Sequence, residues 1–235
     1  MNLNKNRSFQ EIFTDTFVFL QQEWRTFFGC IAIYAAPVSA VASYFSTKVP
    51  DPLDKVSSEM LTFLIFAVIS NFLLQSIAYC YIVCFAQNGT PTHQTVLEFF
   101  TKNIFTCIKA FFISSFVIGL GILLYIVPGV IALAPLSLFA FDKIYTGSPS
   151  GESLSRSMKL TQSNVGMSYA VVLLSYAALL ILQFFVGSLF SGFSTGAQIL
   201  INTVISVLSS TMYIIVALLY FSLRTKIQKP YDNYQ

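Results

Sequence analysis

The chain has few charged residues for its length. Only 10% of its 235 residues are Asp, Glu, Lys or Arg, against about 25% in an ordinary soluble domain. A soluble fold of this size needs more polar surface to cover its core, so much of this surface faces something other than water. The 24 phenylalanines support this interpretation, because so many exposed rings aggregate in water but suit lipid. The scarcity of charge therefore argues against an ordinary soluble domain.

Residues that carry catalysis are equally scarce. His93 is the one histidine, and it lies after Gly89-Thr-Pro91 in a connecting segment, where we interpret it as a solvated loop residue. The sequence has no Gly-x-Ser-x-Gly elbow and no phosphate-binding loop with its lysine. Asp51, Asp54 and Glu59 cluster in a loop, where they form a solvated surface that attracts cations weakly. We therefore expect no catalytic site and no enzyme.

The four cysteines also indicate no special chemistry. Cys30, Cys80, Cys84 and Cys107 all lie in apolar runs. Cys80 and Cys84 are one helical turn apart, but no His or acidic residue stands near them, and zinc sites use closed sets of Cys and His. We interpret all four as small apolar residues that face lipid or other helices. No basic block with interleaved aromatics occurs, so we expect no metal, no cofactor and no nucleic-acid partner.

Long apolar runs make up most of the sequence. A spanning helix needs about 20 mostly apolar residues, and unpaired backbone amides are not tolerated in hydrocarbon, so such runs form helices. The predicted fold class is all-α, a polytopic membrane helix bundle that forms one domain over residues 1–235, with short cytoplasmic amphipathic interfacial helices. The fourth span is short and contains Pro135, so we expect a kink or tilt there. The six predicted spans are 26–45, 60–86, 103–126, 129–145, 165–191 and 197–223.

Basic residues set the expected orientation. With the N-terminus inside, all but Lys48 and Lys55 of the 13 Lys and Arg residues fall on or near the cytoplasmic side. The N-terminal segment does not read as a signal peptide, because Glu11 and Asp15 interrupt it. We therefore expect both termini in the cytoplasm and a bacterial cytoplasmic (inner) membrane.

A juxtamembrane helix is predicted ahead of the first span. Residues 8–24 are amphipathic, and Ser8 with Glu11 fits a capping box. Such a helix lies in the membrane interface and then turns into the first span. Its predicted apolar face consists of Phe9, Ile12, Phe13, Phe17, Leu20 and Trp24.

The same arrangement recurs along the chain. Thr95-Val-Leu-Glu98 spells a second capping box before the third span, and residues 150–160 lead into the fifth. Two interpretations stay open: three units of a lead-in helix and a helical hairpin, or independent lead-ins that any hairpin needs. The outer connections are a polar loop at 46–59, a tight turn at Pro128-Gly129 and a Gly/Ser turn at 192–196.

Uncharged polar residues lie inside the predicted spans, where charged residues are almost absent. Members of the pairs Asn71/Gln75 and Gln198/Asn202 are four residues apart, so each pair projects from one helix face. Together with Gln183 they either line a polar path or hydrogen-bond neighbouring helices, which is worth about 0.6–2 kcal/mol each. We favour helix packing as the more common role.

Part of the sequence resembles a known family. The residues that carry the resemblance are Tyr125-Ile-Val-Pro128-Gly129-Val-Ile-Ala-Leu, Phe141-Asp142-Lys143 and Gly151-Glu-Ser-Leu-Ser-Arg156-Ser157-Met-Lys-Leu160-Thr161. They resemble the membrane domain attached to some bacterial glycerophosphodiester phosphodiesterases and the related YciC-like multi-pass proteins. The likeness is clearest over residues 90–190. The phosphodiesterase is a separate soluble barrel that this chain does not encode, so the resemblance implies a stand-alone membrane module and supplies no catalytic residues.

These observations lead to one leading hypothesis and one alternative. We expect Pro128 and Gly129 to form the turn, and Arg156, next to Ser157, to pair with Asp142 and hold its helix against the bundle. The leading hypothesis is a non-enzymatic inner-membrane module, either an accessory subunit of a membrane complex or a lipid-interacting scaffold. Its expected partners are membrane lipids and another membrane protein or a second copy. The alternative is a small-solute transporter or channel that uses the polar faces of spans two, five and six.

Overall fold

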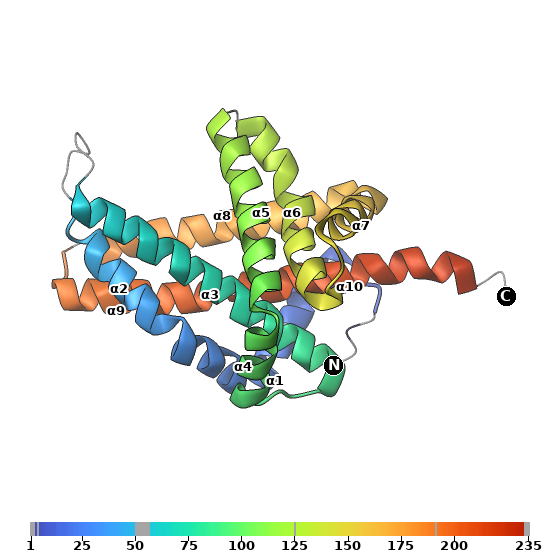
Figure 1. Cartoon of the computed structure of the whole chain (residues 1–235), viewed down its shortest axis with the longest axis horizontal. Helices are drawn as coiled ribbons and strands as arrows, with labels where there is room; N and C mark the ends of the chain where they lie inside the picture. Colours follow the sequence, from blue (N-terminus) through green and yellow to red (C-terminus); the bar gives the residue numbers. More distant parts are fainter. Residues whose placement is uncertain (1–2, 4, 50–56, 125, 191, 233–235) are drawn as a thin grey trace.

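The chain folds almost entirely into α-helices. The computed structural model describes residues 3, 5–49, 57–124, 126–190 and 192–232, and the regular secondary structure of this part is helical throughout. The helices, shown in Figure 1, are α1 (Phe9–Tyr34), α2 (Ala36–Ser46), α3 (Ser58–Asn88), α4 (His93–Lys102), α5 (Ile104–Leu124), α6 (Ile126–Thr146), α7 (Ser150–Ser163), α8 (Val165–Phe190), α9 (Thr195–Ser209) and α10 (Thr211–Asp232).

Several helices are long and apolar enough to cross a membrane. Five candidate spans are given at the end of this paragraph, and the last of them combines α9 with α10. The bent pair α1–α2 is a sixth candidate if it is counted as one span. Helices with this much exposed apolar surface are stable where lipid replaces water. The chain is therefore an all-α polytopic membrane protein, as predicted. The five candidates are Ser58–Gln87, Ile104–Leu124, Ile126–Thr146, Val165–Phe190 and Thr195–Ile227.

The first predicted span differs from the structure. α1 runs without a break through residue 25, where we expected the lead-in helix to end, and stops at Tyr34. α2 then follows at a bend of 56°. Pro37 lies in the first turn of α2, and it cannot continue α1 because it lacks an N–H and its ring clashes with the preceding turn. The predicted division into 8–24 and 26–45 is therefore wrong.

α1 also buries a different face from the predicted one. Phe17 and Trp24 of the predicted apolar face are 66% and 52% exposed. The capping box is confirmed, because Glu11 N–H donates to Ser8 Oγ (3.3 Å) and Ser8 N–H donates to Glu11 Oε2 (2.7 Å). Periodicity missed the inner face because that face includes polar residues. Its buried members are Ile12, Thr16, Phe19, Glu23, Phe27, Cys30 and Ile31.

Short helices precede the second and third pairs of long helices. α4 begins at His93 with Thr92 as its N-cap, and Thr92 Oγ1 accepts a hydrogen bond from Thr95 N–H (3.3 Å). The capping box predicted at Thr95 and Glu98 is therefore wrong by one turn. α7 begins at Ser150, where a lead-in helix was expected. The second and third predicted units agree with this order of elements, whereas in the first unit α1 and the 11-residue α2 do not divide into a separate lead-in helix and a long span.

The connection between α5 and α6 does not lie at Pro128-Gly129. α6 already begins at Ile126, so both residues lie in its first turn. The backbone N–H groups of a first turn have no partner within the helix, so a proline there removes no helical hydrogen bond. Gly129 packs against α5, and a Cβ there would lie 2.6 Å from the backbone nitrogen of Ile122. The predicted turn is wrong: the glycine lets two helices approach closely.

The polar connection predicted at residues 46–59 joins α2 to α3. Residues 50–56, which include Asp51, Asp54 and Lys55, lie outside the described part of the chain. The Gly/Ser turn expected at 192–196 falls between α8 and α9. Because α9 already begins at Thr195, the connection is shorter than expected at that end.

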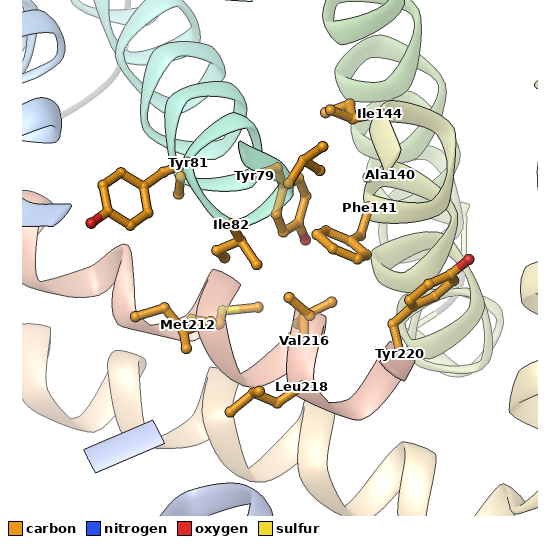
Figure 2. Close-up of a cluster of buried hydrophobic side chains, with 14 of the residues drawn as sticks. Tyr79, Tyr81, Ile82, Ala140, Phe141, Ile144, Met212, Val216, Leu218 and Tyr220 are labelled. Atoms are coloured by element: carbon orange, nitrogen blue, oxygen red, sulfur yellow. The ribbon is translucent and has the colours of Figure 1, made fainter. Parts of the chain in front are cut away.

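Three helices converge in a dense core at the end of the molecule that carries both chain termini. We call this end the terminal half. Residues 76–84 of α3, 136–144 of α6 and 216–223 of α10 are buried without exception. Helices buried on every side are typical of the centre of a large protein. Figure 2 shows their side chains meeting, with Tyr79, Phe141 and Val216 between the three helices.

The other ends of the helices form a looser region that we call the distal half. It comprises the described residues of 36–75, 115–134 and 173–209, most of which are exposed or half-buried. In Figure 1 it includes the far ends of α3, α8 and α9 and the tip of the α5–α6 hairpin. The candidate site lies mainly in this half and borders the core at Tyr79 and Ser137.

Candidate functional site: uncharged polar cavities between the helices

All five polar residues predicted inside the membrane line cavities of the distal half. Asn71 and Gln75 come from α3, Gln183 from α8, and Gln198 and Asn202 from α9. Each pair with a spacing of four lines one common cavity, so the prediction that each pair shares a helix face is confirmed. Together the cavities are the candidate functional site.

The first cavity is surrounded mainly by hydroxyl groups, and we call it the serine cavity. It has a volume of about 340 Å³ and lies between α2, α3, α8 and α9. The Oγ atoms of Ser39 and Ser70 are 2.5 Å apart, which links α2 to α3 through a buried hydrogen bond. The polar side chains that line it are Ser39, Ser43, Ser46, Ser70, Asn71, Gln183, Asn202, Ser206 and Ser209.

The second cavity contains several phenol groups, and we call it the tyrosine cavity. It has a volume of about 350 Å³ and lies between α3, α5, α6, α8 and α10. Asn71 Nδ2 donates to Ala67 O of its own helix (2.9 Å), and an amide offers a second N–H and a carbonyl oxygen besides. The polar side chains that line it are Asn71, Gln75, Tyr79, Ser114, Ser115, Ser137, Tyr176 and Tyr213.

A third cavity, of about 260 Å³, lies between the distal ends of α8 and α9, and we call it the outer cavity. Asn202 lines both the outer and the serine cavity, and Asn71 lines both the serine and the tyrosine cavity. The three cavities therefore follow one another from the α8–α9 turn toward the centre of the molecule. Among the described residues that line them, none is charged.

Aromatic packing lies next to this chain of cavities at the terminal half. The Tyr79 ring packs edge-on against Phe141 and against Tyr213, with 5.2 Å between the ring centroids in both pairs. Phe141 packs in turn against Tyr220 at 5.1 Å. Figure 2 shows Tyr79 directed at Phe141, between α3 and α6. The tyrosine cavity therefore borders the aromatic packing of the core.

The chemistry of the site is limited to uncharged hydrogen bonding. Hydroxyl and amide groups donate and accept hydrogen bonds but supply no counter-charge. A charged ligand group buried among them would lose its hydration without gaining an ion partner, which is costly. The cavities therefore suit an uncharged polar group.

The expected ion pair between α6 and α7 is present in the terminal half. Arg156 Nε lies 3.3 Å from Asp142 Oδ1, and the Tyr220 hydroxyl of α10 donates to the same oxygen at 2.6 Å. Asp142 is fully buried, whereas the Arg156 side chain is 39% exposed. Ser157 is buried on α7 and donates to a carbonyl of its own helix. Asp142 therefore joins the consecutive helices α6 and α7 to α10, which lies far away in the sequence.

Two buried polar contacts are not apparent in the sequence. Arg7 has a fully buried side chain whose Nε lies 2.7 Å from Asp15 Oδ2, and its backbone N–H donates to Ser222 Oγ on α10 (2.9 Å). Glu23 accepts a hydrogen bond from the Tyr81 hydroxyl of α3 (2.9 Å). The sequence around Glu23, Gln21-Gln-Glu-Trp-Arg-Thr26, is mostly polar and gave no signal that this carboxylate is buried. Both contacts tie the N-terminal region to distant helices.

The interpretation of His93 as a solvated loop residue is wrong. His93 begins α4, and its Nδ1 lies 2.8 Å from Cys30 Sγ on α1. It packs against Gly29, where an added Cβ would lie 3.1 Å from His93 Cε1. All four cysteines are buried, so they face other helices and not lipid. In the described part of the chain no three His, Cys, Asp or Glu residues are grouped so that they could hold a metal ion.

The fold and the cavities define a polytopic α-helical membrane protein with an uncharged polar site between its helices. Comparison of the chain with protein-family models, with curated proteins and with solved structures found no match. The resemblance to phosphodiesterase membrane domains therefore stays a prediction from the residues quoted above.

Proposed function

We propose that the protein is a non-enzymatic membrane module that binds an amphiphile with an uncharged polar head group in the chain of cavities. The observation that carries this proposal is the succession of three polar cavities, in which neighbouring cavities share Asn202 or Asn71 in their lining. Polar groups deep in a membrane protein are costly and usually functional. A head group with hydroxyl, amide or ester groups supplies their hydrogen-bond partners.

The surroundings of the cavities favour an amphiphile over a wholly polar ligand. Leu64 and Val68 of α3 are 44% and 46% exposed, and Leu180 and Phe184 of α8 are 65% and 80% exposed. These apolar side chains lie on the two helices that contribute Asn71 and Gln183 to the serine cavity. Acyl chains bind such surfaces without losing contact with the bilayer, so a lipid fits both parts of the site.

The biological setting belongs to the same proposal. We place the protein in a bacterial cytoplasmic membrane with both termini in the cytoplasm, as a lipid-interacting scaffold or an accessory subunit of a membrane complex. The distribution of Lys and Arg supports the orientation. Reporter fusions after Lys48 and after residue 235 test it, because a reporter that needs an oxidising compartment should be active only in the first fusion.

Lipid binding is tested with the purified protein in nanodiscs of mixed lipids. Co-purified lipids are identified by native mass spectrometry for the unchanged chain and for a variant with Asn71→Leu and Asn202→Leu. We expect one class of lipid with an uncharged polar head group to be retained by the unchanged chain and reduced at least tenfold in the variant.

The control for this experiment is Ile33→Ala, which removes an exposed apolar side chain (54%) from α1, a helix that lines none of the three cavities. It should leave the retained lipid unchanged. Equal lipid content in all three proteins, or enrichment of anionic lipid that survives the double substitution, would show that the cavities are not the binding site.

The alternative function is a transporter or channel for small uncharged solutes. The outer cavity favours it, because Gln198 places an amide near the α8–α9 turn, at the start of the chain of cavities. Proteoliposomes that take up a polyol, with a flux that disappears in Asn71→Leu, would support transport. Lipid retention without any flux would support the binding module.

A further inference from the structure

The α5–α6 hairpin stands away from the rest of the distal half. In Figure 1 the green hairpin rises from the core in a different direction from α3, α8 and α9. Its apolar side chains are exposed around the hairpin, as Phe116 (65%), Leu123 (82%) and Ile126 (72%) show. The distal parts of α5 and α6 pack mainly on each other, with Gly121 against Gly129.

The tip of this hairpin has almost no polar groups. Between residues 116 and 134, only Tyr125, which lies outside the described residues, has a side chain that can form a hydrogen bond. The other two distal connections differ, because residues 46–59 include charged residues and residues 191–198 include Ser, Thr and Gln. Connections that reach the head groups and water are normally polar, so the apolar α5–α6 tip suits a position deeper in the membrane.

The apolar part of the hairpin beyond Lys109 and Asp142 is shorter than a complete crossing, although α5 and α6 have 21 residues each. Lys109 is exposed on α5, and its long side chain can extend to the head groups at the terminal side. From Lys109 to Leu124 the helix rises about 22 Å, and from Ile126 to Asp142 about 24 Å, at 1.5 Å per residue. The hydrocarbon core is about 30 Å thick, whereas α8, with 26 residues, is about 39 Å long.

The connection itself is suited to hydrocarbon. Backbone groups without partners are not tolerated there, and α5 and α6 are separated by one residue. Pro128 removes one further N–H from the first turn of α6. The close approach at Gly121 and Gly129 holds the two helices together near the tip, and further along α6 the Tyr169 hydroxyl of α8 donates to Ile131 O (2.5 Å).

We infer that the α5–α6 hairpin ends inside the hydrocarbon and that acyl chains surround its tip, so that it enters and leaves the membrane on the terminal side. The protein then has four complete crossings, made by α1–α2, α3, α8 and α9–α10. An even number of crossings is preserved, so both termini stay on one side. The inference does not depend on which ligand occupies the cavities.

The depth of the tip can be measured by fluorescence quenching. Trp24 is the one tryptophan of the chain, so Trp24→Phe gives a background into which Leu123→Trp or Phe193→Trp is introduced. Phe193 is 54% exposed in the α8–α9 connection and serves as the matched control. The proteins are placed in bilayers of phospholipid brominated at shallow, middle or deep acyl positions.

We expect Leu123→Trp to be quenched most by deep or middle bromines, and Phe193→Trp by shallow ones. If both tryptophans are quenched most by shallow bromines, the hairpin crosses the membrane and the inference is wrong.

A second measurement covers the case in which a tryptophan variant does not fold. Leu123→Cys and Phe193→Cys are treated with a membrane-impermeant maleimide, and the four buried native cysteines give a low background. Phe193→Cys should be labelled in intact membranes, and Leu123→Cys only after detergent is added. Labelling of both at the same rate in intact membranes would overturn the inference.

Discussion

The terminal and distal halves of the molecule bury different kinds of residue. In the terminal half, α3, α6 and α10 are enclosed on all sides, and Asp142 and Arg7 are held inside by specific partners. In the distal half, the helices expose most of their large apolar side chains and enclose cavities lined by hydroxyl and amide groups. The comparison separates two tasks: the terminal half stabilises the fold, and the distal half offers the site.

The difference has a physical basis in the membrane. Lipid tails are as apolar as leucine side chains, so little hydrophobic force closes gaps between helices, and association depends on packing and hydrogen bonds. The distal helices can therefore stand apart around a ligand at low cost. The terminal half has the tight aromatic packing and the buried polar contacts that hold helices together.

The largest expected effect comes from removing one ring from each half. Phe141→Ala deletes a fully buried side chain and should lower the free energy of unfolding by about 3–5 kcal/mol. Phe184→Ala deletes a ring that is 80% exposed on α8 and should change it by less than about 0.5 kcal/mol. Denaturation in detergent micelles measures both, and similar losses would refute the division into halves.

A smaller effect tests the contact inside the α5–α6 hairpin. Gly129→Ala places a Cβ 2.5 Å from Ile122 Cγ1, so the helices must separate, at a cost of about 1–3 kcal/mol. Gly119→Ala meets nothing within 4 Å and is the matched control; it should be neutral or raise stability by up to about 1 kcal/mol. Thermal unfolding of the two variants checks this, and equal midpoints would show that the contact does not matter.

The ion pair should contribute somewhat less. Arg156→Ala leaves the buried Asp142 carboxylate with the Tyr220 hydroxyl but without a cation. We expect a loss of about 1–2 kcal/mol, below that of a fully buried pair because Arg156 is partly exposed to solvent. Adding Asp142→Asn should then cost less than it does alone, which a double-mutant cycle measures. Unchanged stability in Arg156→Ala would mean that the pair does not fix α7.

The smallest expected effect compares the same cap at the two ends. Ser8 caps α1 in the terminal half and Ser57 caps α3 at the distal end. Ser8→Ala should lower stability by about 1 kcal/mol. Ser57→Ala should cost only a few tenths of a kcal/mol, because the loose distal end can fray without unfolding the core. If Ser57→Ala costs more, the distal end contributes more to global stability than its packing indicates.

Local patterns predicted the parts of the fold that depend on nearby residues. Apolar length predicted the long helices, the spacing of Ser8 and Glu11 predicted the capping box, and the spacing of Asn71 and Gln75 predicted their shared face. The prediction that Arg156 reaches Asp142 also agrees with the structure, because the two residues lie on consecutive helices joined by a short connection.

The errors have a common physical origin. The face of α1 was assigned by hydrophobicity, but Glu23 is buried because a phenol of α3 meets it. Pro128 and Gly129 were assigned to a turn, because a Pro-Gly pair is typical of turns, whereas they serve helix entry and close packing. His93 was assigned to solvent, yet it contacts α1. Each of these errors concerns a partner on another helix.

The sequence by itself determined that lipid surrounds most of the protein, because so little charge and such long apolar runs do not suit water. Lipid in turn requires a helical backbone, because its interior offers no hydrogen-bond partners to free amides. Tertiary structure alone decided which helices close against each other and which stand apart. Amides and hydroxyls on single helices acquire a joint role only when packing brings α2, α3, α8 and α9 around one space. Contacts between helices depend on the shapes of both helix surfaces and on the residues that meet there. The residue types along one helix do not indicate which other helix it meets.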